Sequence, residues 1–553
     1  MIRRVVLTGL SGTGKSTLAR LISADLGWTA IDTDSEVEDR AGATIADIFR
    51  DLGEAAFRAS ERAVLRDALA RREVVIATGG GAVVEQDVWS ADLLAHPETL
   101  VVWLDGDSAI LVDRLLAQAR TDGVSAARPL LAEGDPLQRL DAMRTSRGEA
   151  YARADITIPV GWDDPVDIAA DIAEVVRLDH GTPSRIELDT THQRSTITVG
   201  PAAIAALPSL IDAEWPKARH VWAGVDANVR PHVDAALTQV AEIVRPDLQI
   251  IDIPAGEASK SLAGLSLLFD WMLHGGIERG DPVVAIGGGV VGDLVGFAAS
   301  TVLRGVGLVQ IPTTLLAMVD SSVGGKTGIN HPAGKNLIGT FHQPRHVLID
   351  TALLGSLPRP VYRAGWAEII KHVVIEPSTP GGRAGHLLGL LERNSASLAG
   401  QTSALLPLVI RKNVTLKAAV VANDERESGL RAILNFGHTI GHAVEASGYG
   451  LMHGEAVAVG MCAAMAIARE MERIDVATEF RVRDLIAAFG LPVNASFDRD
   501  EVRRHMRSDK KISAGVQRWV LPLGPVGVAL QTGVPELAVE RGLDAITQPT
   551  TGK

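Results

Sequence analysis

The run Gly-Leu-Ser-Gly-Thr-Gly-Lys-Ser at residues 9–16 constrains the fold of this chain more than any other feature. It fits the phosphate-binding pattern G-x-x-x-x-G-K-[ST] and stands between a strand-like segment, residues 5–7, and a helix-like segment, residues 16–26. Glycines let backbone N–H groups converge on phosphate oxygens, and the helix adds its positive N-terminal dipole. The pattern predicts a nucleoside triphosphate site in which Lys15 reaches the β- and γ-phosphates and Ser16 binds Mg²⁺. The loop residues expected around the phosphates are Gly12, Thr13, Gly14, Lys15, Ser16 and Thr17.

Length and composition limit the classes of protein to which this chain can belong. The 553 residues exceed one ordinary domain. Hydrophobic residues form 46% of the chain and the net charge is −13, which fits a soluble globular protein and disfavours a nucleic-acid partner. The single cysteine, Cys462, excludes an internal disulfide and fits a reducing cytoplasm. The longest apolar run, residues 456–468, is too short to cross a membrane and predicts a buried helix.

The order of strand and helix patterns predicts an α/β protein with several domains. Strand and helix patterns alternate over residues 1–178 and again over 195–360, which predicts two regions with parallel sheets covered by helices. Residues 361–545 are almost wholly helical in pattern and predict an all-α subdomain joined to the second α/β region. Residues 179–194 are polar, contain Gly-Thr-Pro and predict a linker.

The first region carries five further patterns that favour a small-molecule kinase over a motor or a switch GTPase. Taken singly, each also fits a surface salt bridge, an ordinary turn or a solvated helix residue. Along the chain they are Asp32-Thr33-Asp34, the pair Glu54 and Arg58 with Phe57 beside them, Gly79-Gly80-Gly81, Arg128-Pro129-Leu130 in an irregular stretch typical of a closing lid, and Arg147.

Together these patterns, in this order, resemble the shikimate kinase family over the whole first region. The resemblance implies that Arg58 and Arg147 bind the shikimate carboxylate, as two guanidinium groups can. It implies that Asp34 orients the attacking hydroxyl and that Gly80 contacts the substrate through its backbone. Asp32 would lie near Mg²⁺, and Arg128 would close over the triphosphate. A sugar kinase of the gluconate type shares the loop and is the alternative.

The second region contains a glycine run followed by a dense polar block. Residues 287–292 fit G-x-G-x-x-G after an apolar strand, but no acidic residue stands about twenty positions further on, as a standard dinucleotide-binding fold requires. We therefore expect a phosphate-cradling glycine turn. The polar block that follows predicts a ligand pocket, with a solvated loop as the alternative; it contains Arg304, Thr313, Thr314, Asp320, Lys326, Lys335 and Asn336.

The helical subdomain carries residues that suit a divalent metal. His438 and His442 stand four apart, which places both imidazoles on one helix face. Glu368 and Lys371 share a face of an earlier helix, and His453 precedes another helix. A single histidine here would more often be structural, but three histidines with a glutamate favour a metal site.

The second and third regions are similar to the 3-dehydroquinate synthase family from about residue 195 to 545, on runs such as AIGGGVVGDLVGF, DSSVGGKTGIN, GKNLIG, AEIIKH and LNFGHTIGHAVEA. The resemblance implies that Glu368, His438 and His453 bind the metal and that His442 serves the substrate phosphate. The spacing alone leaves open which of His438 and His442 is the metal ligand.

The same resemblance implies the other ligand contacts. Residues implied for NAD are Asp226, Asn228, Glu257, Lys260, Gly288, Gly289, Asp293, Thr313, Thr314, Lys326 and Lys335. Residues implied for the substrate and its chemistry are Arg304, Asp320, Lys326, Lys335, Asn336, Lys371, Lys417, Arg431, Asn435, His442 and Lys510 or Lys511.

We therefore expect a bifunctional enzyme of the shikimate pathway. It would use ATP with Mg²⁺ to phosphorylate shikimate, and catalytic NAD with Zn²⁺ or Co²⁺ to convert 3-deoxy-D-arabino-heptulosonate 7-phosphate into 3-dehydroquinate and phosphate. Its partners would be these small molecules and, by resemblance, further copies of itself through the synthase half. The alternatives are a gluconate-type kinase fused to a metal-dependent alcohol dehydrogenase, against which Lys326, Lys335 and Arg431 argue, and a regulator that senses nucleotides, which the intact Lys15, Asp34 and Glu368 oppose.

Overall fold

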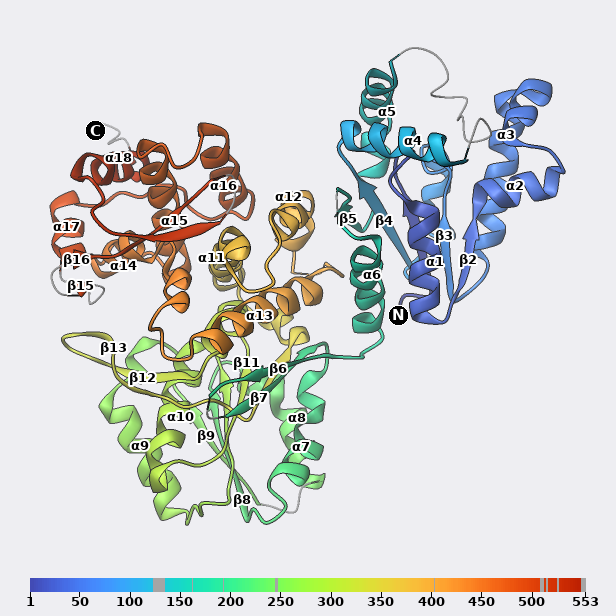
Figure 1. Ribbon diagram of the computed structural model, residues 1–553. Coiled ribbons are helices and arrows are strands. Elements are labelled where there is room, and N and C mark those ends of the chain that lie inside the picture. The colour runs from blue at the N-terminus through green and yellow to red at the C-terminus, as the bar shows by residue number, and fades with distance from the viewer. Residues whose placement is uncertain are drawn as a thin grey trace, which may run out of the picture. The chain divides into compact units, whose positions relative to one another are not determined.

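The computed structural model describes residues 1–122, 135–161, 163–191, 193–243, 247–401, 403–507, 512–513, 516–524 and 527–548. The chain divides into two compact units (Figure 1). The first holds residues 1–182, with which residues 389–398 and 402–408 group, and the second holds the remainder. Among the described residues, no helix is long and apolar enough to cross a membrane.

The first unit is built on a parallel sheet in the order β2-β3-β1-β4-β5. Its apolar core includes Val6, Ile76 and Val101 from the three central strands, together with Leu65 and Leu140 from the covering helices. The elements of residues 1–182 are β1 (Arg4–Thr8), α1 (Lys15–Leu26), β2 (Thr29–Asp32), α2 (Thr33–Ala41), α3 (Ile45–Leu69), β3 (Val74–Ala77), β4 (Thr99–Asp105), α4 (Ser108–Asp122), α5 (Pro136–Tyr151), β5 (Ile156–Pro159) and α6 (Pro165–Asp179).

The second unit begins with a seven-stranded sheet in the order β6-β7-β14-β11-β10-β8-β9, parallel except for the β6–β7 pair. Alternate residues of β10 face opposite sides: Val283 packs with helices α9 and α10, and Val284 packs with α7 and α8. These elements are β6 (Ser184–Asp189), β7 (Arg194–Gly200), α7 (Leu207–Glu214), β8 (His220–Asp226), α8 (Arg230–Ile243), β9 (Asp247–Ile253), α9 (Leu262–His274), β10 (Val283–Gly287), α10 (Gly289–Thr301), β11 (Leu308–Pro312), β12 (Lys326–His331), β13 (Gly334–Phe341) and β14 (His346–Asp350).

The remaining elements are mostly helical, and α15 is the central one (Figure 1). Residues 456–468 of α15 are all buried, so the prediction of a buried helix for this apolar run is confirmed. The elements are α11 (Arg359–Ile375), α12 (His386–Leu398), α13 (Leu406–Asn423), α14 (His438–Ala446), α15 (His453–Glu470), α16 (Val476–Ala488), α17 (Arg499–Arg507), β15 (Ile512–Ser513), β16 (Val516–Gln517), β17 (Trp519–Pro522), β18 (Val528–Gln531) and α18 (Glu536–Ile546).

The α/β fold class with a helical C-terminal part is confirmed, but the subdomain expected to be all-α also contains the antiparallel strand pairs β15–β16 and β17–β18. Two further local expectations differ from the structure. Residues 184–189, inside the expected linker, form strand β6, whose backbone pairs antiparallel with β7. Residues 326–341, expected as a polar block, form the β12–β13 hairpin, which carries Lys326, Lys335 and Asn336 and shifts its register between Ile329 and His331. In both cases the segment is a strand because it pairs with a neighbouring strand, and its polar composition gives no strand signal in the sequence.

Candidate active sites

The phosphate-binding loop of the first unit is formed between β1 and α1, as expected. Gly9, Gly12 and Gly14 have φ angles of 140°, 86° and 89°, which favour glycine, and a Cβ on Gly9 would lie 2.5 Å from the carbonyl oxygen of Leu104. The ammonium group of Lys15 donates to the carbonyl oxygens of Gly9 and Leu10 at 2.8 and 2.9 Å. The lysine is therefore held against the loop in which phosphates would lie.

The expected magnesium residues meet at the start of α1 and α2. The Ser16 hydroxyl donates to Oδ2 of Asp32 at 2.5 Å. The other oxygen of Asp32 accepts from the backbone N–H groups of Asp34 and Ser35, which caps α2. These bonds fix a carboxylate beside a serine hydroxyl at the mouth of the loop, as a Mg²⁺ site requires.

The expected acceptor residues converge around the glycine triplet after β3. A Cβ added to Gly79 would lie 2.6 Å from Oδ1 of Asp34, and one added to Gly81 would lie 2.3 Å from Nη1 of Arg58. The carbonyl oxygen of Gly80 accepts from Nη1 of Arg147 at 2.8 Å and from the Tyr151 hydroxyl at 2.5 Å. Only glycine lets the carboxylate and both guanidinium groups approach the backbone this closely.

Glu61 is a residue of this site that the sequence analysis missed. Its side chain is 1% exposed and pairs with Nη1 of Arg58 at 2.7 Å, whereas the expected partner Glu54 is 66% exposed and 3.3 Å away. Burial raises the pKa of Glu61, although Arg58 opposes that shift. The i,i+3 spacing from Arg58 was the only available signal.

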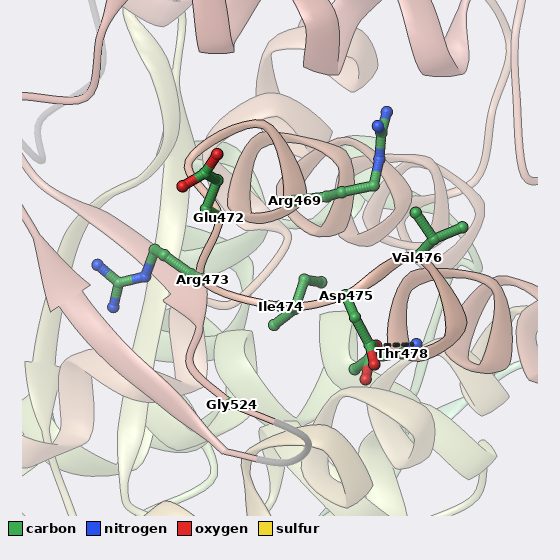
Figure 2. A pocket seen from close by; sticks show the side chains of 8 residues that line it. All are labelled: Arg469, Glu472, Arg473, Ile474, Asp475, Val476, Thr478 and Gly524. Carbon is green, nitrogen blue, oxygen red and sulfur yellow. Dashed lines mark hydrogen bonds between the residues drawn. The ribbon is translucent and has the colours of Figure 1, made fainter.

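Figure 2 shows a pocket of about 570 Å³ that lies away from either set of expected residues. It is lined by residues at the C-terminal end of α15, about 24 Å along that helix from His453 at its start. Arg469 and Arg473 extend in different directions, and they pair with Glu479 and Gln531 respectively (Figure 2). The two arginines that line this pocket therefore do not converge on a common ligand position.

In the second unit, the residues expected for NAD lie at the C-terminal edge of the parallel strands and in the loops beyond it. Asp226 ends β8 and accepts from the N–H of Asn228 at 2.9 Å. Gly288 caps α10, and a Cβ there would lie 3.0 Å from Thr314. Ligands of open α/β sheets bind at this edge. Two further expected residues form polar bonds: Lys260 donates to Asp293 and to Asn336 at 2.5 Å each, and Glu257 accepts from the side-chain amide of Asn330 at 2.8 Å.

The lysines of the β12–β13 hairpin pair with carboxylates that the sequence analysis missed. Lys326 forms an ion pair with Glu427, and Lys335 pairs with Glu445 at 2.6 Å. Asn435 donates to the other oxygen of Glu427 at 2.8 Å. Each carboxylate lies over 100 residues from its lysine, so no local spacing could show these pairs.

A cluster of charges connects α11 and α13 through Asp320. Asp320 forms ion pairs with Lys417 and, at 3.9 Å, with Lys371. Burial raises the pKa of Asp320, but the two lysines outweigh it and lower that pKa well below its usual range. Burial lowers the pKa of Lys417 to about 8, although Asp320 raises it. Arg431 is 2% exposed and donates to the carbonyl oxygen of Gly324 at 3.0 Å.

Glu368 and three histidines form the site that best fits a divalent cation. Nε2 of His438 and Nε2 of His453 lie 3.7 and 3.5 Å from Oε1 of the fully buried Glu368. Two ligands about 2.1 Å from a tetrahedral metal ion are about 3.4 Å apart, so these separations fit one ion between them. His442 lies beside both histidines, with ring centroids 5.0 and 5.7 Å away.

The electrostatics of this site favour a positive charge. Burial lowers the pKa of His453, but Glu368 and Glu445 outweigh it and raise that pKa to about 10. For Glu368, burial acts to raise the pKa. The ion pair with Lys371 outweighs burial, so the pKa of Glu368 lies below its usual range. The carboxylates therefore stabilise a cation here, and a bound metal ion would take the place of the imidazole proton.

Four expected residues are not placed in these clusters. Arg304 follows α10 in an exposed turn with a φ of 69° and forms no ion pair among the described residues. Arg128 and the pair Lys510 and Lys511 lie outside the described residues.

Family models match both parts of the chain. The model for shikimate kinase matches residues 11–177, and the models for the 3-dehydroquinate synthase N-terminal and C-terminal regions match residues 250–364 and 365–512. The 3-dehydroquinate synthase of Symbiobacterium thermophilum is 43% identical over 65% of this chain and 99% of its own length. That of Prochlorococcus marinus is 45% identical over 57% of this chain and 84% of its own length.

Two solved structures share the fold of the second unit. The 2-epi-5-epi-valiolone synthase from Streptomyces hygroscopicus, with NAD⁺ and Zn²⁺ bound, is 31% identical and has a TM-score of 0.58 over 63% of this chain and 96% of that one. A 2-deoxy-scyllo-inosose synthase complexed with carbaglucose-6-phosphate, NAD⁺ and Co²⁺ is 25% identical, with a TM-score of 0.59 over 66% of this chain and 100% of that one. The chain thus belongs to the 3-dehydroquinate synthase family and carries a shikimate kinase domain ahead of its synthase, which makes it a bifunctional enzyme of the shikimate pathway.

Proposed function

We propose that each unit contains one complete active site, with the residue roles given below. The observation that carries the proposal is the convergence, in each unit, of the ligand groups that its reaction needs. In the first unit these are a lysine-bearing phosphate loop, a serine–aspartate pair and two arginines beside a glycine triplet. In the second they are a strand-edge glycine turn, a lysine-rich hairpin and a glutamate facing two imidazoles.

In the kinase, Lys15 and the loop N–H groups hold the ATP phosphates, and Ser16 with Asp32 holds Mg²⁺. Asp34 accepts the hydrogen of the attacking hydroxyl, and Arg58 and Arg147 bind the carboxylate of shikimate. The 2.7 Å pair with Glu61 supports this role for Arg58, because it keeps the guanidinium beside Gly81.

In the synthase, Glu368, His438 and His453 hold the divalent metal, and His442 faces the substrate. Asp226, Asn228, Glu257, Lys260 and the turn at Gly288 hold NAD, with the other strand-edge residues expected above. When bound, the metal supplies Lewis-acid polarisation of a substrate oxygen and NAD accepts and returns a hydride. Zn²⁺ and Co²⁺ both suit this donor set.

The cations of the synthase bind the seven-carbon substrate and its phosphate. Lys326 and Lys335 now pair with Glu427 and Glu445, and a substrate phosphate would replace those carboxylates. Lys417 pairs with Asp320, and Arg431 donates to the carbonyl oxygen of Gly324 just before the hairpin; both cations hold further negative charge. Asp320, which is 22% exposed, keeps Lys371 and Lys417 in place.

The direct test measures phosphate release from 3-deoxy-D-arabino-heptulosonate 7-phosphate with trace NAD, before and after chelation. We expect release that needs both NAD and metal and leaves no net NADH. Steady NADH formation from simple alcohols without phosphate release would overturn the synthase assignment. The same preparation with ATP should phosphorylate shikimate in preference to gluconate.

The alkaline limb of the synthase pH profile should report Lys417. Its pKa of about 8 means that its charge is present below that pH and lost above it, while Asp320, Lys371 and Arg431, which face it, stay charged. We expect kcat/KM for the heptulosonate phosphate to fall above pH 8, and Lys417→Arg to move that limb upward by more than one pH unit, because guanidinium does not titrate there. An unmoved limb would assign it to another group.

We further propose that the enzyme acts in a reducing cytoplasm and self-associates through its synthase half. The single buried cysteine supports the first point, and the resemblance of residues 195–545 to the synthase family supports the second. Sedimentation velocity on the full chain tests self-association, since a single species of 58.4 kDa at all concentrations would contradict it.

A further inference from the structure

Glu445 joins the metal site to the substrate-binding hairpin. It stands on α14 at positions i+7 from His438 and i+3 from His442, so all three side chains share one face of that helix. Its Oε2 lies 3.0 Å from Nδ1 of His453, and its Oε1 lies 2.6 Å from the ammonium of Lys335. The carboxylate is 15% exposed, and both of its oxygens are thus engaged.

This contact determines which nitrogen of His453 is available. Because a carboxylate at 3.0 Å accepts the hydrogen on Nδ1, Nε2, which faces Glu368, is the nitrogen whose lone pair would bind a metal that displaces its proton. His438 reaches the same state with a different acceptor, since its Nδ1 lies 3.0 Å from the carbonyl oxygen of Phe436. Both imidazoles thereby present Nε2 to one carboxylate oxygen.

The two histidines depend on these acceptors to different degrees. The His438 side chain is 10% exposed, so its ring is held both by packing and by the hydrogen bond to the backbone. The His453 side chain is 34% exposed and stands at the first position of α15, where packing is weaker. The ring orientation of His453 therefore relies more on its hydrogen bond.

We propose that Glu445 is the positioning residue for the metal site: it fixes the tautomer and orientation of His453 and, through Lys335, ties them to the substrate-binding hairpin. The inference rests on the proposed function, because it takes Glu368, His438 and His453 as the metal ligands. Carboxylates that orient metal-bound histidines commonly contribute about 10- to 100-fold to metal affinity.

The test measures the Zn²⁺ dissociation constant of the full-length protein by competition with a chromophoric chelator. We expect Glu445→Leu, which removes the acceptor, to weaken binding about 10- to 100-fold. Glu445→Gln keeps a neutral acceptor at the same length, so it should recover much of that loss. In Co²⁺-loaded protein, Glu445→Leu should also change the visible absorption bands, which report ligand geometry.

Glu427 offers a matched control, because it pairs with the other hairpin lysine and contacts Asn435 but no histidine. We expect Glu427→Leu to leave Zn²⁺ affinity within about twofold of wild type. If Glu445→Leu, Glu445→Gln and Glu427→Leu all weaken binding equally, or if wild-type affinity persists in Glu445→Leu, the positioning role is wrong. A wild-type protein that binds no Zn²⁺ would instead overturn the proposed metal site itself. Should Glu445→Leu fail to fold, Glu445→Gln alone tests the role. A positioning role then predicts that Glu445→Gln loses a measurable but less than tenfold part of its Zn²⁺ affinity and changes the absorption bands of the Co²⁺-loaded protein.

Discussion

Replacing Lys15 by methionine is expected to lower kcat for shikimate phosphorylation by at least about a thousandfold, which corresponds to about 4 kcal/mol of transition-state stabilisation. Lys15 is the cation of the phosphate loop, and its ammonium already lies within 2.9 Å of the Gly9 and Leu10 carbonyls. Methionine keeps the length of the side chain but removes the charge that stabilises the transferred phosphoryl group.

The two activities of the chain supply an internal control for this variant. The phosphate-loop residues all lie in the first unit, so phosphate release by the synthase should stay at the wild-type rate in Lys15→Met. Arg66→Met removes an exposed cation from α3 and should leave both rates unchanged. A kinase rate that survives the loss of Lys15 would contradict the proposed role of the loop. An equal fall in both rates would point to misfolding, which thermal unfolding detects.

The parts of the fold that sequence could predict are those whose signals are local. The phosphate loop lies between a strand and a helix within about twenty residues. Its backbone has positive φ angles at the glycine positions, and such angles favour glycine. Residues 456–468 predict a buried helix because a continuous apolar run of that length has few other uses in a globular domain. Strand β6 was missed because its polar residues become a strand only by pairing with β7.

The candidate sites show the same difference between residues with a local sequence signal and residues whose partners are distant in sequence. Glycine, histidine and lysine motifs could be found because their chemistry is carried by residue type and short spacing. The carboxylates Glu61, Glu427 and Glu445 could not, because a glutamate on a helix or in a turn is ordinary until its partner is known. Glu445 becomes informative only when folding brings Lys335, 110 positions earlier, to within 2.6 Å of it. The missed residues are thus the ones that hold other groups in place.

Replacing Glu368 by glutamine is expected to remove the metal from the synthase and to lower its kcat/KM by at least about a thousandfold. Glu368 is the only one of the three proposed ligands that brings a negative charge, and it faces Nε2 of both His438 and His453. A neutral amide retains the shape but loses the attraction for a divalent ion. Atomic absorption on the dialysed protein measures the metal, and phosphate release measures the rate.

In Glu368→Gln, a loss of stability must be distinguished from a loss of the metal, because Glu368 also forms a buried ion pair with Lys371. Removing one partner of such a pair costs about 3 to 5 kcal/mol, so Glu368→Gln should also unfold at a lower temperature. His453→Ala leaves that pair intact, and we expect it to lose the metal and the synthase rate without a comparable loss of stability. Glu536→Gln, on the exposed side of α18, should change none of these quantities.

The pair of variants therefore distinguishes the two causes of inactivity. Loss of metal in both, with wild-type shikimate phosphorylation in both, supports a metal site formed by Glu368 and His453 within the synthase unit. Retention of one equivalent of metal in His453→Ala, with loss in Glu368→Gln, would indicate that other side chains complete a site with Glu368. The candidates are His442, whose ring centroid lies 5.0 Å from that of His438, and the pair Asp320 and His372. Retention in both variants would contradict the ligand assignment, because no other group of histidine and acidic side chains among the described residues offers two imidazole Nε2 atoms to one carboxylate.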